Sequence, residues 1–418
     1  MSDFDYEIKD ISLAASGREK ISWAYKNMPV LREIEKQLAI EKPFSGLRIA
    51  VSVHVEAKTA CLAKVLRSGG ADVSLTGCNP LSTQDDVAAA LVEDGMKVFC
   101  IYGADETQYN RHLLMALSCN PHIVIDDGGD FAKILHTTRR DLLANIIGGC
   151  EETTTGVHRL RILEREGKLE YPVIAVNDAK CKHLFDNRFG TGQSVWTAIM
   201  ATTNLIVAGK TIVVAGFGMC GKGIAMRAKG LGAKVVITEI DSVKASEALM
   251  EGYDVMPMDH AAMVGDVFIT VTGCRDVISG DQFLKMKDGA ICCNAGHFDV
   301  EVNLIDLQKL SISKSVLRSG IEGYLLPSGK TVCVLAQGRL VNLASGDGHP
   351  VEIMDMSFSL QALCARSIAL NGRKLEKRVY DTPADIDEAV AGMLLESKNV
   401  QVDTLTENQI KYLNSWDS

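Results

Sequence analysis

The chain has 418 residues, of which 47% are hydrophobic and 23% are charged, and its net charge is −9. This length is sufficient for two hydrophobic cores. The acidic balance, with no cluster of five or more Lys and Arg residues, argues against nucleic acid as the main partner, so we expect small metabolites instead.

Cysteine usage and the N-terminal sequence indicate a reducing compartment. The twelve cysteines are scattered, several of them inside apolar runs, and they form no CxxC pair or other metal-ligand spacing. We therefore expect free thiols and no metal. The acidic N-terminus has no apolar signal region, and no apolar stretch is long enough to span a bilayer, which predicts a cytoplasmic protein.

Short apolar runs alternate with helical patterns through the N-terminal half, after a turn at Gly17–Arg18. The patterns predict strands at 47–53, 71–75, 98–102, 122–125 and 173–176, and helices at 57–66, 87–91 and 109–117. Such alternation is typical of a parallel sheet with helices on both faces.

Polar residues follow these strands, where ligands bind in parallel sheets. His54 follows the first strand, Cys78–Asn79 follow the second, and the run Asp126–Asp130, with the sequence Asp-Asp-Gly-Gly-Asp, follows the fourth. A helix cap or turn explains Asn79, and later Asp178, better than a ligand does. Adjacent carboxylates followed by two glycines favour a function for 126–130.

Two further segments combine charged and hydroxyl side chains. Residues 151–156 read Glu-Glu-Thr-Thr-Thr-Gly, a sequence of poor helix propensity that suits polar ligand contacts. Lys182 and Asp186 are four residues apart, so a helix would place them on one face. They are either a surface ion pair or, because they directly precede the nucleotide-binding segment, a pair that faces the site.

The most informative motif lies near the middle of the chain. The apolar run 211–215 ends in Gly216-x-Gly218-x-x-Gly221 and is followed by helix-forming residues, an order that lets the backbone approach a pyrophosphate. The apolar run 235–238 ends at Glu239, whose carboxylate would bind ribose hydroxyls and repel a 2′-phosphate. The sequence thus predicts a Rossmann fold that binds NAD rather than NADP. The alternative is a glycine-rich turn without a nucleotide.

Six separated stretches resemble S-adenosyl-L-homocysteine hydrolase, in that family's order and over nearly the entire chain. They are DDGGD (126–130), EETTTGVHRL (151–160), KHLFDNRFGTGQS (182–194), VAGFGMCGKG (214–223), NAGHFDVE (294–301) and RLVNLASGDGHP (339–350). The resemblance implies two doubly wound parallel α/β domains. A Rossmann NAD-binding domain (189–350) would be inserted into a discontinuous substrate-binding domain (1–188 and 351–398), with a C-terminal tail (399–418) and a homotetrameric assembly.

The resemblance also implies a reaction, the NAD-dependent reversible hydrolysis of an S-nucleosyl-L-homocysteine to homocysteine and a nucleoside. Its steps are oxidation of the 3′-hydroxyl, elimination of homocysteine, addition of water and reduction. Lys182 and Asp186 would act at the 3′-hydroxyl and at C4′, and the sequence does not decide which of them takes which proton. His54 and Asp127 would move protons near C5′.

The family's other site positions carry over residue by residue. Besides Asp127, Lys182 and Asp186, the expected substrate contacts are Glu56, Lys58, Thr59, Glu152, His297 and His349. The expected cofactor contacts are Thr153, Thr154, Thr155, Asn187, Gly216, Gly218, Met219, Cys220, Gly221, Lys222, Gly223, Glu239, Lys244, Thr272, Ala295, Gly296, His297 and Asn342.

One segment departs from the family pattern His-x-Thr-x-Glu-Thr, whose Thr and Glu lie against the adenine edge. Here the sequence is His54-Val-Glu56-Ala-Lys58-Thr59. A Lys58 donor suits O6 of hypoxanthine and a Glu56 acceptor suits its N1–H, which predicts a preference for S-inosyl-L-homocysteine. The alternatives are that Glu56 favours the first helical turn with Lys58 in solvent, and that S-adenosyl-L-homocysteine is the main substrate.

Two other functions are compatible with a Rossmann fold that binds NAD. An NAD-dependent hydroxy-acid dehydrogenase would release NADH at each turnover. A catalytically idle NAD-binding regulator is disfavoured, because His54, Lys182 and Asp186 are all present.

Overall fold

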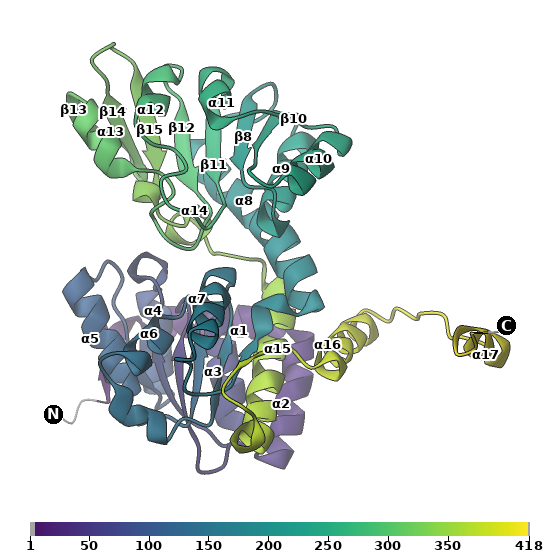
Figure 1. Cartoon of the computed structure of the whole chain (residues 1–418). Helices are drawn as coiled ribbons and strands as arrows, with labels where there is room; N and C mark the ends of the chain where they lie inside the picture. Colours follow the sequence, from purple (N-terminus) through teal and green to yellow (C-terminus); the bar gives the residue numbers. More distant parts are fainter. Residues whose placement is uncertain (1–4, 417–418) are drawn as a thin grey trace.

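A computed structural model describes residues 5–416 and contains two α/β units, one above the other in Figure 1. The first unit is built on the sheet order β1-β4-β3-β2-β5-β6-β7-β16, in which every neighbouring pair is parallel. Its strands are β1 (Tyr6–Glu7), β2 (Arg48–Ser52), β3 (Asp72–Thr76), β4 (Lys97–Phe99), β5 (Ile123–Asp126), β6 (Gly148–Glu151), β7 (Val173–Ala175) and β16 (Val379–Asp381).

Helices cover both faces of this first sheet, and separate apolar clusters fill the two faces. The helices are α1 (Ala14–Lys26), α2 (Pro29–Glu41), α3 (Ala57–Ser68), α4 (Asp85–Glu93), α5 (Glu106–Leu117), α6 (Asp130–His136), α7 (Thr154–Arg165), α15 (Val351–Asn371) and α16 (Ala384–Ser397). Both α15 and β16 come late in the chain, so two separated parts of the sequence build this unit.

The second unit has the sheet order β10-β9-β8-β11-β12-β15-β14-β13. Its strands are β8 (Thr211–Ala215), β9 (Lys234–Thr238), β10 (Asp254–Val255), β11 (Val267–Thr270), β12 (Ile291–Asn294), β13 (Ser313–Arg318), β14 (Ile321–Leu325) and β15 (Thr331–Leu335). Its helices are α8 (Thr191–Thr203), α9 (Met219–Gly230), α10 (Ser242–Met250), α11 (Met258–Val264), α12 (Asp281–Lys285), α13 (Leu304–Leu310) and α14 (Val341–Ala344).

The predicted fold class is confirmed, with one addition. Six neighbouring strands of each sheet follow the 3-2-1-4-5-6 order of a doubly wound sheet, namely β4-β3-β2-β5-β6-β7 in the first unit and β10-β9-β8-β11-β12-β15 in the second. In the second unit β14 and β13 extend this order as antiparallel edge strands. The strand order reverses between β2 and β5 in the first sheet and between β8 and β11 in the second, and ligands bind at such switch points.

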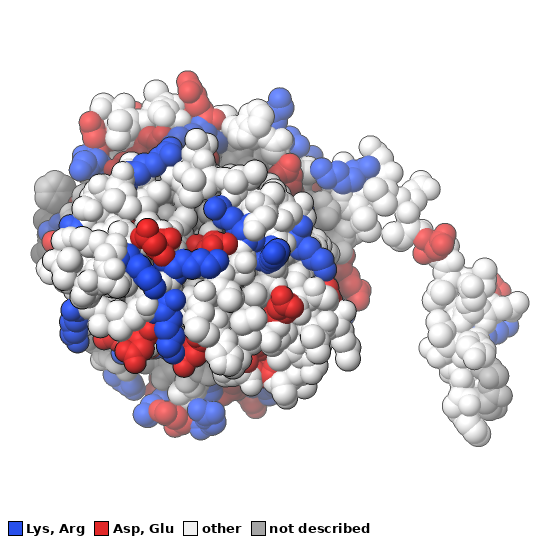
Figure 2. Space-filling view, turned by 90° about the horizontal axis from the view of Figure 1, so that it is seen from above, with Lys and Arg blue, Asp and Glu red and all other residues white. Residues whose placement is uncertain are grey.

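The surface and the C-terminal arm complete the fold. Figure 2 shows basic and acidic side chains interspersed over one face of the molecule. Helix α17 (Glu407–Leu413) stands away from both units at the end of an extended segment (Figure 1). All twelve cysteines, which lie within the described residues, are free, as expected. Among those residues, none of the helices is both long and apolar enough to cross a membrane.

Candidate active site

The Lys182 side chain lies at the centre of a buried charge cluster. It begins a π-helix, Lys182–Gly190, whose wide turn directs Lys182, Asp186 and Asn187 inward. The ammonium nitrogen lies 2.9 Å from Asn187 Oδ1, 3.3 Å from Asp186 Oδ2 and 3.4 Å from Glu152 Oε1. Only 7% of the Lys182 side chain and 1% of the Asp186 side chain are exposed, so the surface-ion-pair interpretation is wrong.

The protonation states of this cluster follow from burial and mutual attraction. Burial opposes the charge on Lys182, but Asp186 and Glu152 raise its pKa, and it remains an ammonium. Burial would raise the pKa of Asp186, yet Lys182 and His349 hold it well below the ordinary value. Burial outweighs the effect of Lys182 at Glu152 and raises its pKa to about 7. Within this cluster, Glu152 is thus the carboxyl group that can exchange a proton near neutral pH.

Helix α15, which lies far from Glu152 and Asp186 in the sequence, donates hydrogen bonds to both of these side chains. The Ser357 hydroxyl donates to Asp186 Oδ2 at 2.6 Å, and the Gln361 amide donates to Glu152 Oε2 at 2.5 Å. From the loop before α15, His349 Nδ1 lies 2.6 Å from Asp186 Oδ1. Sequence analysis identified His349 but missed Ser357 and Gln361, because a serine and a glutamine within a long helix give no signal of this contact.

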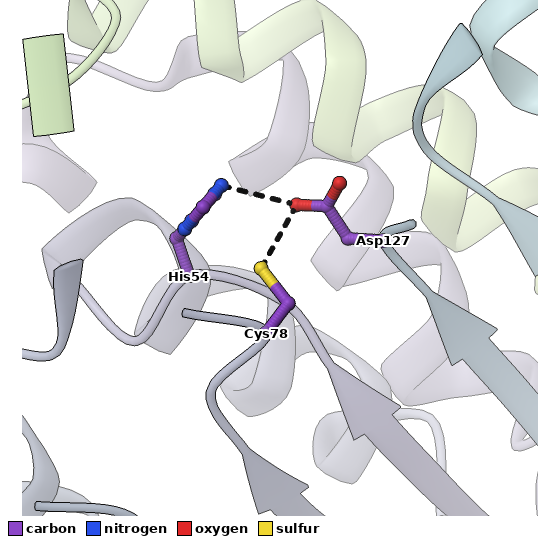
Figure 3. Close-up of side chains that lie close together, drawn as sticks. All are labelled: His54, Cys78 and Asp127. Atoms are coloured by element: carbon purple, nitrogen blue, oxygen red, sulfur yellow. Dashed lines mark hydrogen bonds and ion pairs between the residues drawn. The ribbon is translucent and has the colours of Figure 1, made fainter. Parts of the chain in front are cut away.

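A second cluster forms where β2, β3 and β5 end, at the switch point of the first sheet. Figure 3 shows His54, Cys78 and Asp127 pointing toward one another. His54 Nε2 lies 3.5 Å from Asp127 Oδ2, and the Cys78 thiol lies 3.4 Å from the same oxygen. Burial raises the pKa of Asp127 to about 8 and lowers that of His54 well below its ordinary value.

Hydrogen bonds to neighbouring residues fix the position of His54. The Thr59 hydroxyl donates to the His54 carbonyl at 2.6 Å, so Thr59 positions this residue from the first turn of α3. The His54 ring contacts Ser82 Oγ through Nδ1 at 2.6 Å. Ser82 was not identified from the sequence. Asn79 was expected to be a cap, and it does cap the short helix Pro80–Ser82.

The second unit contributes His297 to this cluster. Its Nδ1 lies 3.8 Å from Asp127 Oδ1, and its ring lies so close to Gly128 that a Cβ there would overlap it. Gly128 has a φ of +108°, a conformation that favours glycine. Burial lowers the pKa of His297 to about 4. The loop that carries His297 is shaped by Asn294, whose side-chain amide donates to the carbonyls of Gly296 and Phe298.

The segment 151–156 is more regular than its composition indicated. Glu151 ends β6, and Thr153 caps α7 by accepting the Gly156 amide, so a helix begins where polar ligand contacts were expected. The fully buried Glu151 carboxylate accepts the amides of Gly128 and Thr153. These two bonds connect the loop of Asp127 to the start of α7.

Glu56 and Lys58 form a buried pair beside the site. The Glu56 carboxylate caps α3 by accepting the amides of Lys58 and Thr59. The Lys58 ammonium lies 3.1 Å from Glu56 Oε2 and donates to the carbonyls of Asp347 and His349 at 2.6 and 3.0 Å. The interpretation that Lys58 is in solvent is wrong, since only 6% of its side chain is exposed.

The switch point of the second sheet fits a dinucleotide. Gly216 has a φ of +101°, and a Cβ on Gly221 would overlap the Gly216 carbonyl oxygen, so both positions require glycine. At Gly218 no heavy atom of the described residues outside the chain neighbours lies within 4 Å of a Cβ position, which leaves room for a pyrophosphate. Gly218 is the N-cap residue of α9 and has no side chain that could accept the first backbone amides of the helix. These amides are therefore available to an anion.

Other expected cofactor residues surround this switch point. Glu239 follows β9 and accepts the Phe217 amide at 2.7 Å, which holds it beside the glycine turn. Asn342 is buried, and its Oδ1 has no hydrogen-bond partner among the described residues, as expected of an atom whose partner is a ligand. The Thr272 amide and hydroxyl both donate to Glu301, a buried carboxylate whose role the sequence did not indicate.

The remaining expected residues fall into two groups. Lys222 pairs with Glu247 at 2.5 Å, and the half-exposed Lys244 lies 3.8 Å from Asp241, so both ammonium groups have protein partners. Three of the others, Thr154, Asn187 and Cys220, contact neighbouring side chains. Thr154 donates to Asn177, the Asn187 amide donates to the same oxygen, and the Cys220 thiol lies 3.5 Å from the Thr191 hydroxyl.

Comparisons with known proteins agree with this architecture. Residues 5–146 match the family model described as S-adenosyl-L-homocysteine hydrolase, and residues 187–348 match its NAD binding domain. An S-inosyl-L-homocysteine hydrolase from Methanocaldococcus jannaschii is 53% identical, covering 98% of this chain and 99% of the relative. Adenosylhomocysteinases from Pyrococcus abyssi (99% and 98%) and Thermotoga maritima (96% and 99%) are also 53% identical. The chain therefore belongs to the S-adenosyl-L-homocysteine hydrolase family and is an enzyme that uses NAD.

Proposed function

We propose that this enzyme hydrolyses the thioether of an S-nucleosyl-L-homocysteine and that it prefers the inosyl over the adenosyl substrate. The observation that carries the preference is the buried Lys58 ammonium, at the position where the family contacts the base. An ammonium has three donors and no acceptor, so when Lys58 exchanges one of its contacts to Glu56, Asp347 or His349 for the base, it can bind the O6 of hypoxanthine but not the amino group of adenine. Glu56 supplies the complementary acceptor for N1–H.

The names of the relatives leave the base open, because inosyl and adenosyl enzymes are both 53% identical to this chain. The alternative is therefore that S-adenosyl-L-homocysteine is the main substrate. Its amino group would then face the Lys58 ammonium, and this amino group would be left without an acceptor. Each unsatisfied buried group costs about 1–3 kcal/mol, which corresponds to about a 5- to 150-fold difference in kcat/KM.

Lys182, Glu152 and Asp186 are proposed to act around the 3′-hydroxyl and C4′. Bound NAD supplies reversible oxidation of the sugar carbon. Because Lys182 is held as an ammonium, it can accept a proton from a hydroxyl only after it gives up its own. Glu152, 3.4 Å away and with a pKa of about 7, can receive that proton, and Asp186 remains ionised beside them.

His54 and Asp127 are proposed to handle the protons at C5′. The leaving thiolate requires a proton during elimination, and the water that adds later must lose one. A carboxyl group with a pKa of about 8 next to an imidazole can do both. The deep burial of both clusters keeps bulk water from the reacting carbons.

The substrate preference is tested by measuring kcat/KM for the two thioethers. We expect the wild type to favour the inosyl compound and the Glu56→Thr, Lys58→Glu double variant to move toward the adenosyl compound. Lys64→Glu, on the same helix but paired with Asp94 near the surface, is the control and should leave the ratio unchanged. A wild type that clearly favours the adenosyl thioether refutes the preference, and a failure to release homocysteine from either refutes the proposed reaction.

We also propose that the enzyme is a homotetramer. Apolar side chains stand on the C-terminal arm away from both units, with Val402 68%, Leu413 65% and Trp416 97% exposed. Such side chains are expected to pack against another copy. Light scattering of the full chain tests the assembly, and any mass other than that of four copies at assay concentration would contradict the tetramer.

A further inference from the structure

Three metal-ligating atoms converge at the switch point of the first sheet. A ring nitrogen of His54, the Cys78 sulfur and a carboxyl oxygen of Asp127 all lie within 4.8 Å of one another (Figure 3). A tetrahedral zinc ion, with bonds of about 2.0–2.3 Å, holds its ligand atoms about 3.3–3.6 Å apart. The separations from Asp127 Oδ2 are 3.5 Å to His54 and 3.4 Å to Cys78.

The hydrogen bonds around His54 direct a lone pair into this cluster. The Ser82 hydroxyl has a single proton, which it donates to the Asn79 carbonyl at 2.8 Å. At its 2.6 Å contact with His54 Nδ1 it must therefore be the acceptor, so the ring carries its proton on Nδ1. Nε2 is then unprotonated and faces Asp127. An imidazole whose other nitrogen is held in this way is typical of a metal ligand.

The Asp127 carboxyl group provides a second, independent indication. Its side chain is only 4% exposed, and Oδ1 has no hydrogen-bond partner among the described residues. The group facing that oxygen is His297 Nδ1, at 3.8 Å. A buried carboxyl oxygen without a hydrogen-bond partner is costly unless a cation or a donor compensates for it.

We propose that His54, Cys78 and Asp127 form a binding site for a divalent cation of the zinc class. An imidazole, a thiolate and a carboxylate are ligands typical of this class and not of Mg²⁺ or Ca²⁺. Binding breaks the S–H bond of Cys78 and the O–H bond of Asp127, forms a metal–sulfur and a metal–oxygen bond, and releases both protons to solvent. Water or His297 completes the coordination.

The sequence could not predict this site, because its three ligands are separated by 24 and 49 residues along the chain. A bound cation would occupy the two groups that we propose act at C5′, so it would inhibit turnover. This inhibition rests on the proposed function, but the binding does not.

Cobalt(II) added to the NAD-loaded full chain provides a spectroscopic test. We expect one equivalent to bind with an intense thiolate-to-cobalt charge-transfer band, which Zn²⁺ abolishes by displacing the cobalt. Cys78→Ser should lose the band. Cys274→Ser, which removes an exposed thiol elsewhere, should keep it. Absence of the band in the wild type, or a band of equal intensity in Cys78→Ser, would overturn the site.

Ser82→Ala keeps the test decisive if Cys78→Ser does not fold. This variant retains all three ligands but not the group that orients His54, and it should weaken cobalt binding by roughly ten- to a hundred-fold. Unchanged affinity would contradict the tautomer argument. Zinc should inhibit turnover over the concentration range in which it displaces cobalt. If cobalt binds but the metal-free enzyme releases no homocysteine, the proposed function fails and the metal site stands.

Discussion

Replacing Lys182 with Met tests the electrostatics on which the proposed mechanism depends. The variant leaves Glu152 and Asp186 buried, with exposed side-chain fractions of 6% and 1%, and removes the ammonium that both of them face. Removing one partner of a buried ion pair typically costs about 3–5 kcal/mol. We expect a loss of this size in the free energy of unfolding at pH 8, measured by urea titration of the NAD-loaded protein.

This loss should shrink as the pH falls. Lys182 is the main group that lowers the pKa values of Glu152 and Asp186, so in the variant both carboxyl groups bind protons more readily in the folded than in the unfolded state. A carboxyl group whose pKa is higher in the folded than in the unfolded state makes the protein less stable as the pH rises. The free energy of unfolding then falls by about 1.4 kcal/mol per pH unit for each such proton. The difference in the free energy of unfolding between the wild type and the variant should therefore be smaller at pH 5.5 than at pH 8.

Two controls separate charge from packing. Adding Glu152→Gln and Asp186→Asn to the variant removes the unpaired carboxylates and should restore most of the stability. Lys36→Met breaks an ion pair of 2.8 Å on the exposed face of α2 and should cost no more than about 1 kcal/mol. A loss below about 1 kcal/mol for Lys182→Met, or one independent of pH, would refute the reasoning.

Three further predictions concern the glycines and the active-site carboxyl group. Gly218→Ala should fold with an unchanged melting temperature but bind NAD more weakly. Gly221→Ala should bind NAD more weakly and also melt at a lower temperature, because its Cβ would overlap the Gly216 carbonyl. Calorimetry measures the binding and the melting temperature, and equal effects of the two variants would contradict the assignment. Hydrolysis should decline above about pH 8, where Asp127 loses its proton, and a profile that stays flat to pH 9.5 would exclude Asp127 as the acid. Gly17→Ala should destabilise the protein by about 1–3 kcal/mol in thermal unfolding, because its Cβ would overlap the Asp86 carbonyl where α1 packs against α4. An unchanged melting temperature would argue against this close approach.

The sequence predicted most of the fold, because the spacing of the apolar residues distinguished strands from helices and because polar residues directly follow the apolar runs. His54 and Asp127 were identified this way, since the carboxyl ends of parallel strands meet at one edge. Gly17 shows where local rules fail. A glycine was interpreted as a turn, but it lies inside α1, where close packing against α4 excludes a side chain.

The parts of the site that were missed depend on distant contacts. Ser357 and Gln361 lie 171 and 209 residues from the carboxylates they support, and no local pattern marks them. Glu151 was interpreted as part of a ligand-binding segment, because the composition of residues 151–156 is typical of such a segment. Its fully buried side chain instead accepts hydrogen bonds from the backbone amides of Gly128 and Thr153. The π-helix at Lys182 was also unpredicted, because its widened turn depends on the packing of α9 and α15 against it.

The position of α15 in the chain has a consequence for biosynthesis. The strands of the second unit are all encoded before Val351, whereas the Ser357 and Gln361 partners of Asp186 and Glu152 follow it. On the ribosome, the nucleotide-binding sheet can be complete while these carboxylates still lack their neighbours. A nascent polypeptide of this enzyme therefore gains a finished catalytic centre only after α15 has been translated.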